Sequence, residues 1–251
     1  MKTKRKRRGR IRLGVVLMMA VVVIVALVGV AFLFNVREIK VEGDIQRYNT
    51  DELIAASGVT KGKSLLLLSE EKISDSICSQ FPYVSVVTLK KDYPSTVTLI
   101  IRESTECAAM KFEGEYYLLD ENCRVLDMID AASAGGYIEI QGFEMTGGDR
   151  GSTIEVAPEN EMKLKFTQEI LSALDTAGLI SDVESIDVSN VGNITFEYDG
   201  RLQVKLGGGD KLDYKMSRLE EILKELAESD NGTIDLSEEG RAYFIPARSG
   251  N

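Results

Sequence analysis

The longest apolar stretch of the chain covers residues 13–34 and reads LGVVLMMAVVVIVALVGVAFLF. It contains no charged residue and no Asn, Gln, Ser or Thr. A helix of this length rises by about 33 Å, which matches the hydrocarbon core of a bilayer at about 30 Å. Backbone groups in lipid must be paired within their own segment, so the pattern predicts a single transmembrane helix.

The polar flanks of this stretch predict its orientation. Eight of residues 1–12 are Lys or Arg, and the first acidic residue of the chain is Glu38. By the positive-inside rule, residues 1–12 form a basic cytoplasmic tail and the rest is exported. A cleaved signal peptide is the alternative, because Gly29-Val30-Ala31 is a weak small-x-small pattern. The apolar run exceeds the about 7–15 residues of a signal core, which favours an uncleaved anchor and a single-pass type II cell-membrane protein.

The first exported segment, residues 35–103, alternates between strand and helix patterns. Residues 50–58 predict a short helix capped by Thr50, and a second helix follows Ser69. The apolar stripe of the second helix recurs every four residues and consists of Ile73, Ile77 and Phe81. Strands with period-two alternation are predicted at 36–41, 84–90 and 96–102. The element order is β-α-α-β-β.

The second exported segment, residues 104–246, reads mainly as strands and predicts an antiparallel β domain with two helices. The helices are expected at 159–177, with Met162, Phe166, Ile170 and Leu174 on one face, and at 211–228. The strands are expected at 106–111, 116–120, 124–127, 137–140, 185–188, 193–198, 202–206, 233–236 and 242–246. The fold class is therefore α+β, and residues 247–251 are expected to be a flexible tail.

Side chains suited to catalysis are scarce. The chain has no histidine, which excludes Ser-His and Cys-His nucleophile pairs and the commonest metal ligand. Cys78, Cys107 and Cys123 lack CxxC spacing, and a Cys107–Cys123 disulfide is left open. Acidic pairs such as Glu220-Glu221 and Glu238-Glu239 are expected on a solvated face, since the net charge is −10. We predict no catalytic, cofactor-binding or metal-binding residue, and a binding module rather than an enzyme.

Several motifs occur in a characteristic order along the chain. VREIKVEG begins at Val36, directly after the apolar segment, and FPYV begins at Phe81. YPSTV begins at Tyr93 and leads to IRE at Ile101. YYLLD begins at Tyr116, and TIDL begins at Thr233. With the basic tail and the single anchor, this order resembles the FtsQ/DivIB family of bacterial cell-division proteins over nearly the whole chain. Residues 141–158 match no part of the family pattern that we can place.

The resemblance implies a POTRA domain at 35–103, the family's β domain at 104–246, and a place at the division septum. It implies a bitopic divisome scaffold that binds FtsL-type and FtsB/DivIC-type proteins outside the membrane and helps to regulate septal peptidoglycan synthesis. In the family the last β-domain strand offers its edge to the FtsB-type partner. The corresponding residues here are Arg241, Ala242, Tyr243, Phe244 and Ile245. The alternative is a membrane-tethered enzyme that acts on peptidoglycan through an Asp/Glu pair.

Overall fold

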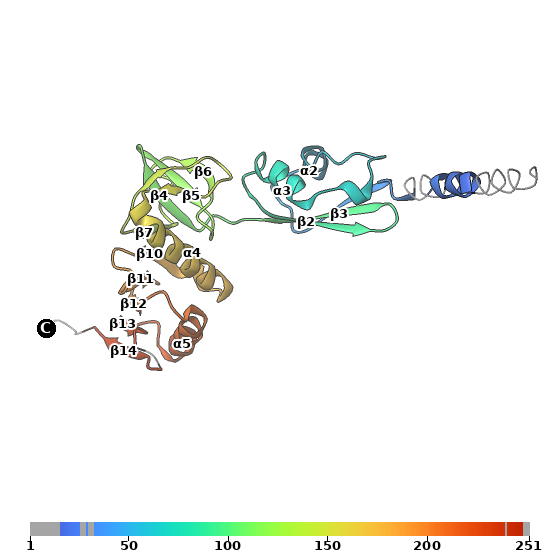
Figure 1. The fold of residues 1–251 in the computed structure, drawn as a ribbon. Coiled ribbons are helices and arrows are strands. Elements are labelled where there is room, and N and C mark those ends of the chain that lie inside the picture. Colours follow the sequence, from blue (N-terminus) through green and yellow to red (C-terminus); the bar gives the residue numbers. More distant parts are fainter. Residues whose placement is uncertain (1–15, 26–28, 30–32, 239, 248–251) are drawn as a thin grey trace, which may run out of the picture. The chain divides into compact units, whose positions relative to one another are not determined.

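The computed structural model describes residues 16–25, 29, 33–238 and 240–247, and two compact units account for the folded part. The first unit contains residues 1–78 and 85–103, and the second contains residues 79–84 and 104–251. Figure 1 shows the elements of each unit. The α+β class is confirmed, because helices and strands alternate in the first unit and sheet predominates in the second.

The predicted membrane segment, residues 13–34, lies partly outside the described residues. Residues 16–25 are helical, and their large apolar side chains are exposed. Within the ranges that the structure describes, no helix combines the length and the apolar character needed to cross a membrane.

The first unit is a three-stranded sheet with two helices. The strands are β1 (Glu38–Glu42), β2 (Val84–Asp92) and β3 (Thr96–Glu103), in the order β1-β3-β2, and β1 runs parallel to β3. The helices are α2 (Thr50–Ala56) and α3 (Glu70–Cys78), with a 3₁₀ turn at Leu65–Leu67 between them. The element order agrees with the predicted β-α-α-β-β pattern. Fully buried side chains hold the unit together, among them Leu53, Leu65, Ile77, Val97 and Leu99.

Two local predictions in this unit were wrong. The side chain of Asn49, not that of Thr50, caps α2 by accepting a hydrogen bond from the Asp51 N–H at 2.8 Å. Phe81 lies outside α3, because the helix ends at Cys78. Ile73 and Ile77 are the buried positions of the helix, so its apolar stripe is one turn shorter than the spacing suggested.

A nine-stranded mixed sheet forms the second unit. Its strand order is β14-β13-β12-β11-β10-β7-β4-β5-β6. Antiparallel pairs predominate, while β12–β13, β10–β7 and β4–β7 are parallel. The strands are β4 (Ala108–Phe112), β5 (Glu115–Leu119), β6 (Val125–Ile129), β7 (Ile138–Gln141), β10 (Val183–Asp187), β11 (Ile194–Tyr198), β12 (Leu202–Gly207), β13 (Gly232–Asp235) and β14 (Tyr243–Pro246).

Two helices pack on this sheet, and Figure 1 shows them on the same side of it. They are α4 (Glu161–Thr176) and α5 (Leu212–Glu225). Ile170, Leu171 and Leu174 of α4 are fully buried and join one continuous core with Phe196 of β11. Met162 was predicted on this buried face but is 58% exposed, because it lies in the first turn of the helix.

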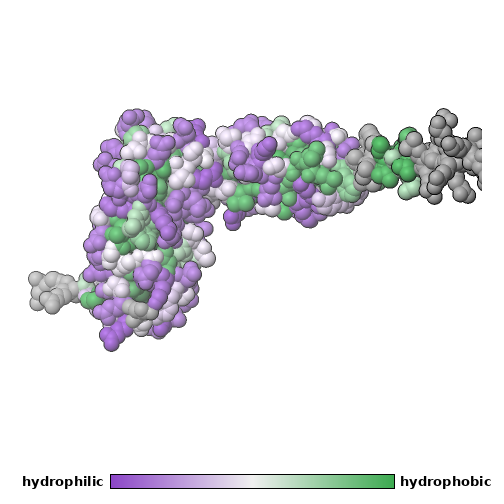
Figure 2. All heavy atoms as spheres, in the orientation of Figure 1, coloured by the Kyte–Doolittle hydropathy of each residue, from purple (hydrophilic) through white to green (hydrophobic). Residues whose placement is uncertain are grey.

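The segment that matched no family pattern, residues 141–158, contains two short strands that the sequence did not predict. They are β8 (Met145–Gly147) and β9 (Glu155–Val156), which pair with each other in an antiparallel ribbon. Met145 and Ile154 are buried in the core of the second unit. The visible surface of both units mixes hydrophilic and apolar side chains (Figure 2).

Candidate functional site

The predicted partner-binding residues lie at one end of the large sheet. β14 pairs with β13 on one side and is the last strand in the sheet order, so among the described residues its other side has no neighbouring strand. Strand edges of this kind present unpaired N–H and C=O groups to which another chain can add a strand. Of the predicted residues, Tyr243, Phe244 and Ile245 lie in this edge strand, and Arg241 and Ala242 directly precede it.

The two faces of β14 differ in burial. Phe244 lies opposite Ile234 of β13, which is fully buried, and Phe244 packs against the core. Tyr243 and Ile245 are on the other face and are 41% and 52% exposed. Side chains alternate across a strand, so only Tyr243 and Ile245 are available to a partner on that outer face.

The backbone N–H and C=O groups of β14 point alternately toward β13 and away from it. The Ala247 N–H donates to the carbonyl of Asn231 at 2.9 Å, so residue 247 faces β13. Residues 243 and 245 share this orientation, and the N–H of Phe244 and the backbone of Ala242 face away from the sheet. Pro246 has no N–H, which limits the length over which a further strand can pair.

A groove of about 500 Å³ runs beside the edge, between α5 and residues 240–243. Its lining includes Ile222 together with charged side chains of both signs, namely Arg218, Glu221, Glu225 and Arg241. Glu238 organises the strand end, because it accepts a hydrogen bond from the Tyr243 hydroxyl at 3.1 Å and lies 3.6 Å from the Arg241 guanidinium. The groove can therefore receive a segment that carries both apolar and charged groups.

Arg218 is held in place on α5. Its guanidinium lies 5.5 Å from the centre of the Tyr214 ring and forms an ion pair with Glu221. The hydrogen bond to Tyr214 and the Glu221 carboxylate raise the pKa of Arg218 above its ordinary value. Arg218 therefore contributes a positive charge to the lining of the groove.

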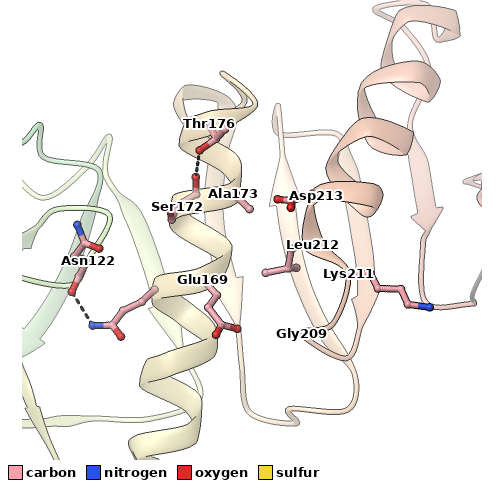
Figure 3. Close-up of a pocket in the computed structure, with 10 residues that line it drawn as sticks. Asn122, Glu169, Ser172, Ala173, Thr176, Gly209, Lys211, Leu212 and Asp213 are labelled. Atoms are coloured by element: carbon pink, nitrogen blue, oxygen red, sulfur yellow. Dashed lines mark hydrogen bonds between the residues drawn. The ribbon is translucent and has the colours of Figure 1, made fainter.

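A second groove, of about 540 Å³, lies between α4 and α5 (Figure 3). Its wall on α4 is polar and includes Glu169, Ser172 and Thr176. The Gln168 side chain donates to the Asn122 carbonyl at 2.8 Å, and the Thr176 hydroxyl donates to the Ser172 carbonyl at 2.8 Å. These contacts stabilise the helix and its neighbouring turn, and they do not place a nucleophile beside a base.

Cys107 and Cys123 have the properties of structural thiols. All three cysteines are free, and Cys123 is fully buried. Burial raises the pKa of Cys107 and of Cys123 well above the ordinary value, and nearby carboxylates, including Asp120, add to the effect. A protonated thiol is a poor nucleophile and a poor metal ligand. In the ranges that the structure describes, His, Cys, Asp and Glu side chains form no cluster that could hold a metal ion.

The acidic pairs that the sequence singled out are engaged with neighbouring cations. Glu220 pairs with Lys224, and Glu221 pairs with Arg218. Glu238 binds Tyr243 and Arg241, while Glu239 lies outside the described residues. These carboxylates therefore have the character of a solvated surface.

Family models match both units. Residues 34–104 match the model described as "POTRA domain, FtsQ-type", and residues 108–237 match "Cell division protein FtsQ/DivIB, C-terminal". The chain belongs to the FtsQ/DivIB family of cell-division proteins.

Curated FtsQ/DivIB relatives agree with this assignment. Cell division protein DivIB of Clostridium botulinum (strain Hall) is 25% identical, over 84% of this chain and 81% of its own length. DivIB of Clostridium acetobutylicum is also 25% identical, over 84% of this chain and 82% of its own length. Cell division protein FtsQ of Geobacter sp. (strain M21) is 26% identical, over 72% of this chain and 65% of its own length.

The match to the FtsQ/DivIB C-terminal model ends at residue 237, before β14 begins at Tyr243. The family match therefore gives no information on β14, and the structure alone supports its edge position. Sequence reasoning predicted residues 241–245 as the partner site and did not include Gly232 and Glu238, which contact residues of that segment. Gly232 has φ +152° and faces the Ile245 carbonyl, a close approach that only a glycine allows.

Proposed function

We propose that this FtsQ/DivIB protein is a bitopic scaffold of the division machinery whose strand β14 accepts a β-strand from an FtsB/DivIC-type partner. An FtsL-type protein joins the same complex, and the assembly helps to regulate septal peptidoglycan synthesis. The family membership supports a role in cell division. The observation that carries the partner assignment is the edge position of β14, with Tyr243 and Ile245 exposed beside an amphipathic groove.

The proposed topology follows from the sequence pattern. Residues 13–34 span the cell membrane, residues 1–12 remain in the cytoplasm, and residues 35–246 lie on the outer side at the division septum. Residues 35–103 form the POTRA domain and residues 104–246 form the β domain that carries the partner site. In this topology β14 is on the same side of the membrane as the exported part of a bitopic partner.

Substitution of Gly232 tests whether the partner binds to the backbone of β14, because it changes no side chain of that strand. A Cβ at position 232 would lie 2.2 Å from the Ile245 carbonyl oxygen, so Gly232→Ala displaces β14 from β13. We expect at least about tenfold weaker capture of the FtsB/DivIC-type partner from the same organism, which corresponds to about 1.4 kcal/mol. The measurement is titration of the purified exported part of the partner onto the full-length protein in detergent.

Gly114→Ala is the matched control. Gly114 also has a positive φ, of +96°, but no atom lies within 4 Å of the added Cβ. Both variants carry the backbone strain of a residue with positive φ, and only Gly232→Ala moves β14. Unchanged affinity for Gly232→Ala, with circular dichroism showing a folded chain, would contradict the proposal.

Side-chain variants examine the outer face. Tyr243→Ser and Ile245→Ser remove apolar contact area from exposed positions, and we expect each to weaken capture several-fold. Met128→Ser, on the opposite end strand β6, is the control because Met128 is likewise 41% exposed. Equal capture by all three variants would place the partner elsewhere on the protein.

A further inference from the structure

The first unit exposes two adjacent leucines at the place where the apolar segment ends. Leu66 is 53% exposed and Leu67 is 85% exposed, the largest exposed fraction of any large apolar side chain in the described residues. The preceding residue, Leu65, is fully buried and fixes the 3₁₀ turn so that its neighbours point outward. Figure 2 shows apolar surface on this unit. Adjacent exposed apolar side chains of this kind are typical of protein-interaction and membrane-interaction sites.

Backbone hydrogen bonds tie this turn to the last residues of the apolar segment. The Leu65 N–H donates to the Phe34 carbonyl at 2.7 Å, and the Val36 N–H donates to the Lys63 carbonyl at 2.8 Å. Asn35 and Ser64 form a β-bridge between these two bonds. Paired backbones lie about 4.8 Å apart, so Leu65 lies one strand spacing from Phe34, and Leu66 and Leu67 follow it directly in the chain.

An aromatic side chain flanks Phe34 as well. The rings of Phe34 and Tyr93 meet edge to face, with 5.6 Å between their centres, and Tyr93 is 59% exposed. Tyr93 lies in the turn between β2 and β3, and the Lys91 ammonium at the end of β2 donates to the Leu68 carbonyl at 2.8 Å. The hairpin tip and the leucine turn therefore meet around Phe34, and we name this surface, Leu66, Leu67 and Tyr93, the leucine pole.

The charge of the leucine turn itself is positive in a chain that is acidic as a whole. Residues 58–68 contain Lys61 and Lys63, both exposed, and no acidic residue, whereas the net charge of the chain is −10. Tyrosine and lysine are the residues that favour the headgroup region of a bilayer, the first by its amphipathic ring and the second by attraction to anionic lipids.

We propose that the leucine pole inserts Leu66 and Leu67 into the outer lipid–water interface, with Lys61 and Lys63 on anionic headgroups. This inference rests on the proposed membrane span of residues 13–34. The turn that carries Leu66 and Leu67 is hydrogen-bonded to Phe34, the last residue of that span, so the bilayer is the apolar environment nearest to the leucine pole. Contact with the lipid–water interface holds the first unit at the membrane surface and restricts its rotation relative to the transmembrane helix.

Tryptophan fluorescence tests the insertion directly, because the natural chain contains no tryptophan. The full-length Leu67→Trp variant is reconstituted into vesicles whose lipid tails carry bromine, a contact quencher. Met162→Trp is the matched control, since Met162 is exposed on α4 of the second unit. Val22→Trp reports on the span itself. We expect strong quenching of the Val22→Trp and Leu67→Trp variants, and severalfold less for Met162→Trp.

Every other quenching pattern contradicts either the leucine pole or the membrane span. Quenching of Val22→Trp without quenching of Leu67→Trp refutes the leucine pole and leaves the anchor standing. A blue-shifted but unquenched Leu67→Trp shows that protein, a partner or a second copy, covers the pole. No quenching of either variant refutes both the anchor and the pole.

Lipid composition tests the lysines. Quenching of Leu67→Trp should be stronger in phosphatidylcholine vesicles that contain phosphatidylglycerol than in phosphatidylcholine alone. Adding Lys61→Glu should remove that difference, whereas adding Lys111→Glu, an exposed lysine on β4, should preserve it. Equal quenching in both vesicle types would refute the role of the lysines in headgroup binding.

Discussion

The guanidinium of Arg124 lies 3.9 Å from the carboxylate of Asp120, which is completely buried in the second unit. The carboxylate also accepts hydrogen bonds from the Ser104 hydroxyl at 2.8 Å and from the backbone N–H groups of Asn122 and Arg124 at 2.9 Å. The guanidinium donates in turn to the carbonyls of Pro82, Val84 and Gly151. One ion pair thus connects several chain segments within that unit.

Removal of this carboxylate should destabilise the protein strongly. In Asp120→Ala the Arg124 charge and several buried donors lose their partner, and we expect the free energy of unfolding to fall by about 3 kcal/mol. Asp127→Ala is the control, because Asp127 pairs with Arg150 at the surface and should cost under about 1 kcal/mol. Urea denaturation followed by circular dichroism measures both, and equal losses would contradict a structural role for Asp120.

Asp187 should contribute to the pH dependence of the free energy of unfolding. Hydrogen bonds from Ser189, whose N–H lies 2.7 Å from the carboxylate, lower the pKa of Asp187 below its ordinary value. The unfolded chain therefore binds the proton more readily, so this contribution is complete above the unfolded pKa of about 3.9 and is lost as the pH falls through the folded pKa. Ser189→Ala should raise the pKa of Asp187, as measured by NMR titration. An unchanged titration would contradict the assignment.

Cys107 and Cys123 should react only when the second unit opens. Burial raises the pKa of Cys107 and Cys123, so both thiols stay protonated at pH 8 and should react with a maleimide much more slowly than in urea. Mass spectrometry after labelling in urea without reductant should find three modified cysteines. Modification of Cys78 alone would show that Cys107 and Cys123 form a disulfide.

Much of the fold follows from local sequence patterns. The helices α4 and α5 and the strands β11 and β12 are close to the positions that periodicity predicts, because each has a buried face within one continuous segment. The strands β8 and β9 could not be predicted in this way, since they have three and two residues and lie between glycines and polar turns. Their pairing depends on contacts that only the folded unit provides.

For the edge strand β14 too, the sequence predicted the element but not the orientation of its side chains. The apolar run of residues 242–246 predicts a strand, and the family resemblance implied contact residues from Arg241 to Ile245, including Tyr243 and Phe244. The sequence could not separate the two, because their burial depends on which face of β14 meets the core. The structure shows that Phe244 packs against the core, so Phe244→Asp would bury a charge and not only remove a partner contact. Charge burial at this position would destabilise the sheet.

Amide hydrogen exchange at β14 tests the central claim most directly. The N–H of Phe244 faces away from β13, while those of Tyr243 and Ile245 face it, so neighbouring amides of one strand serve as test and control. When the FtsB/DivIC-type partner binds, exchange at Phe244 should slow by about tenfold or more, with smaller changes at Tyr243 and Ile245. Unchanged exchange at Phe244 in a partner-saturated sample would contradict strand addition at this edge.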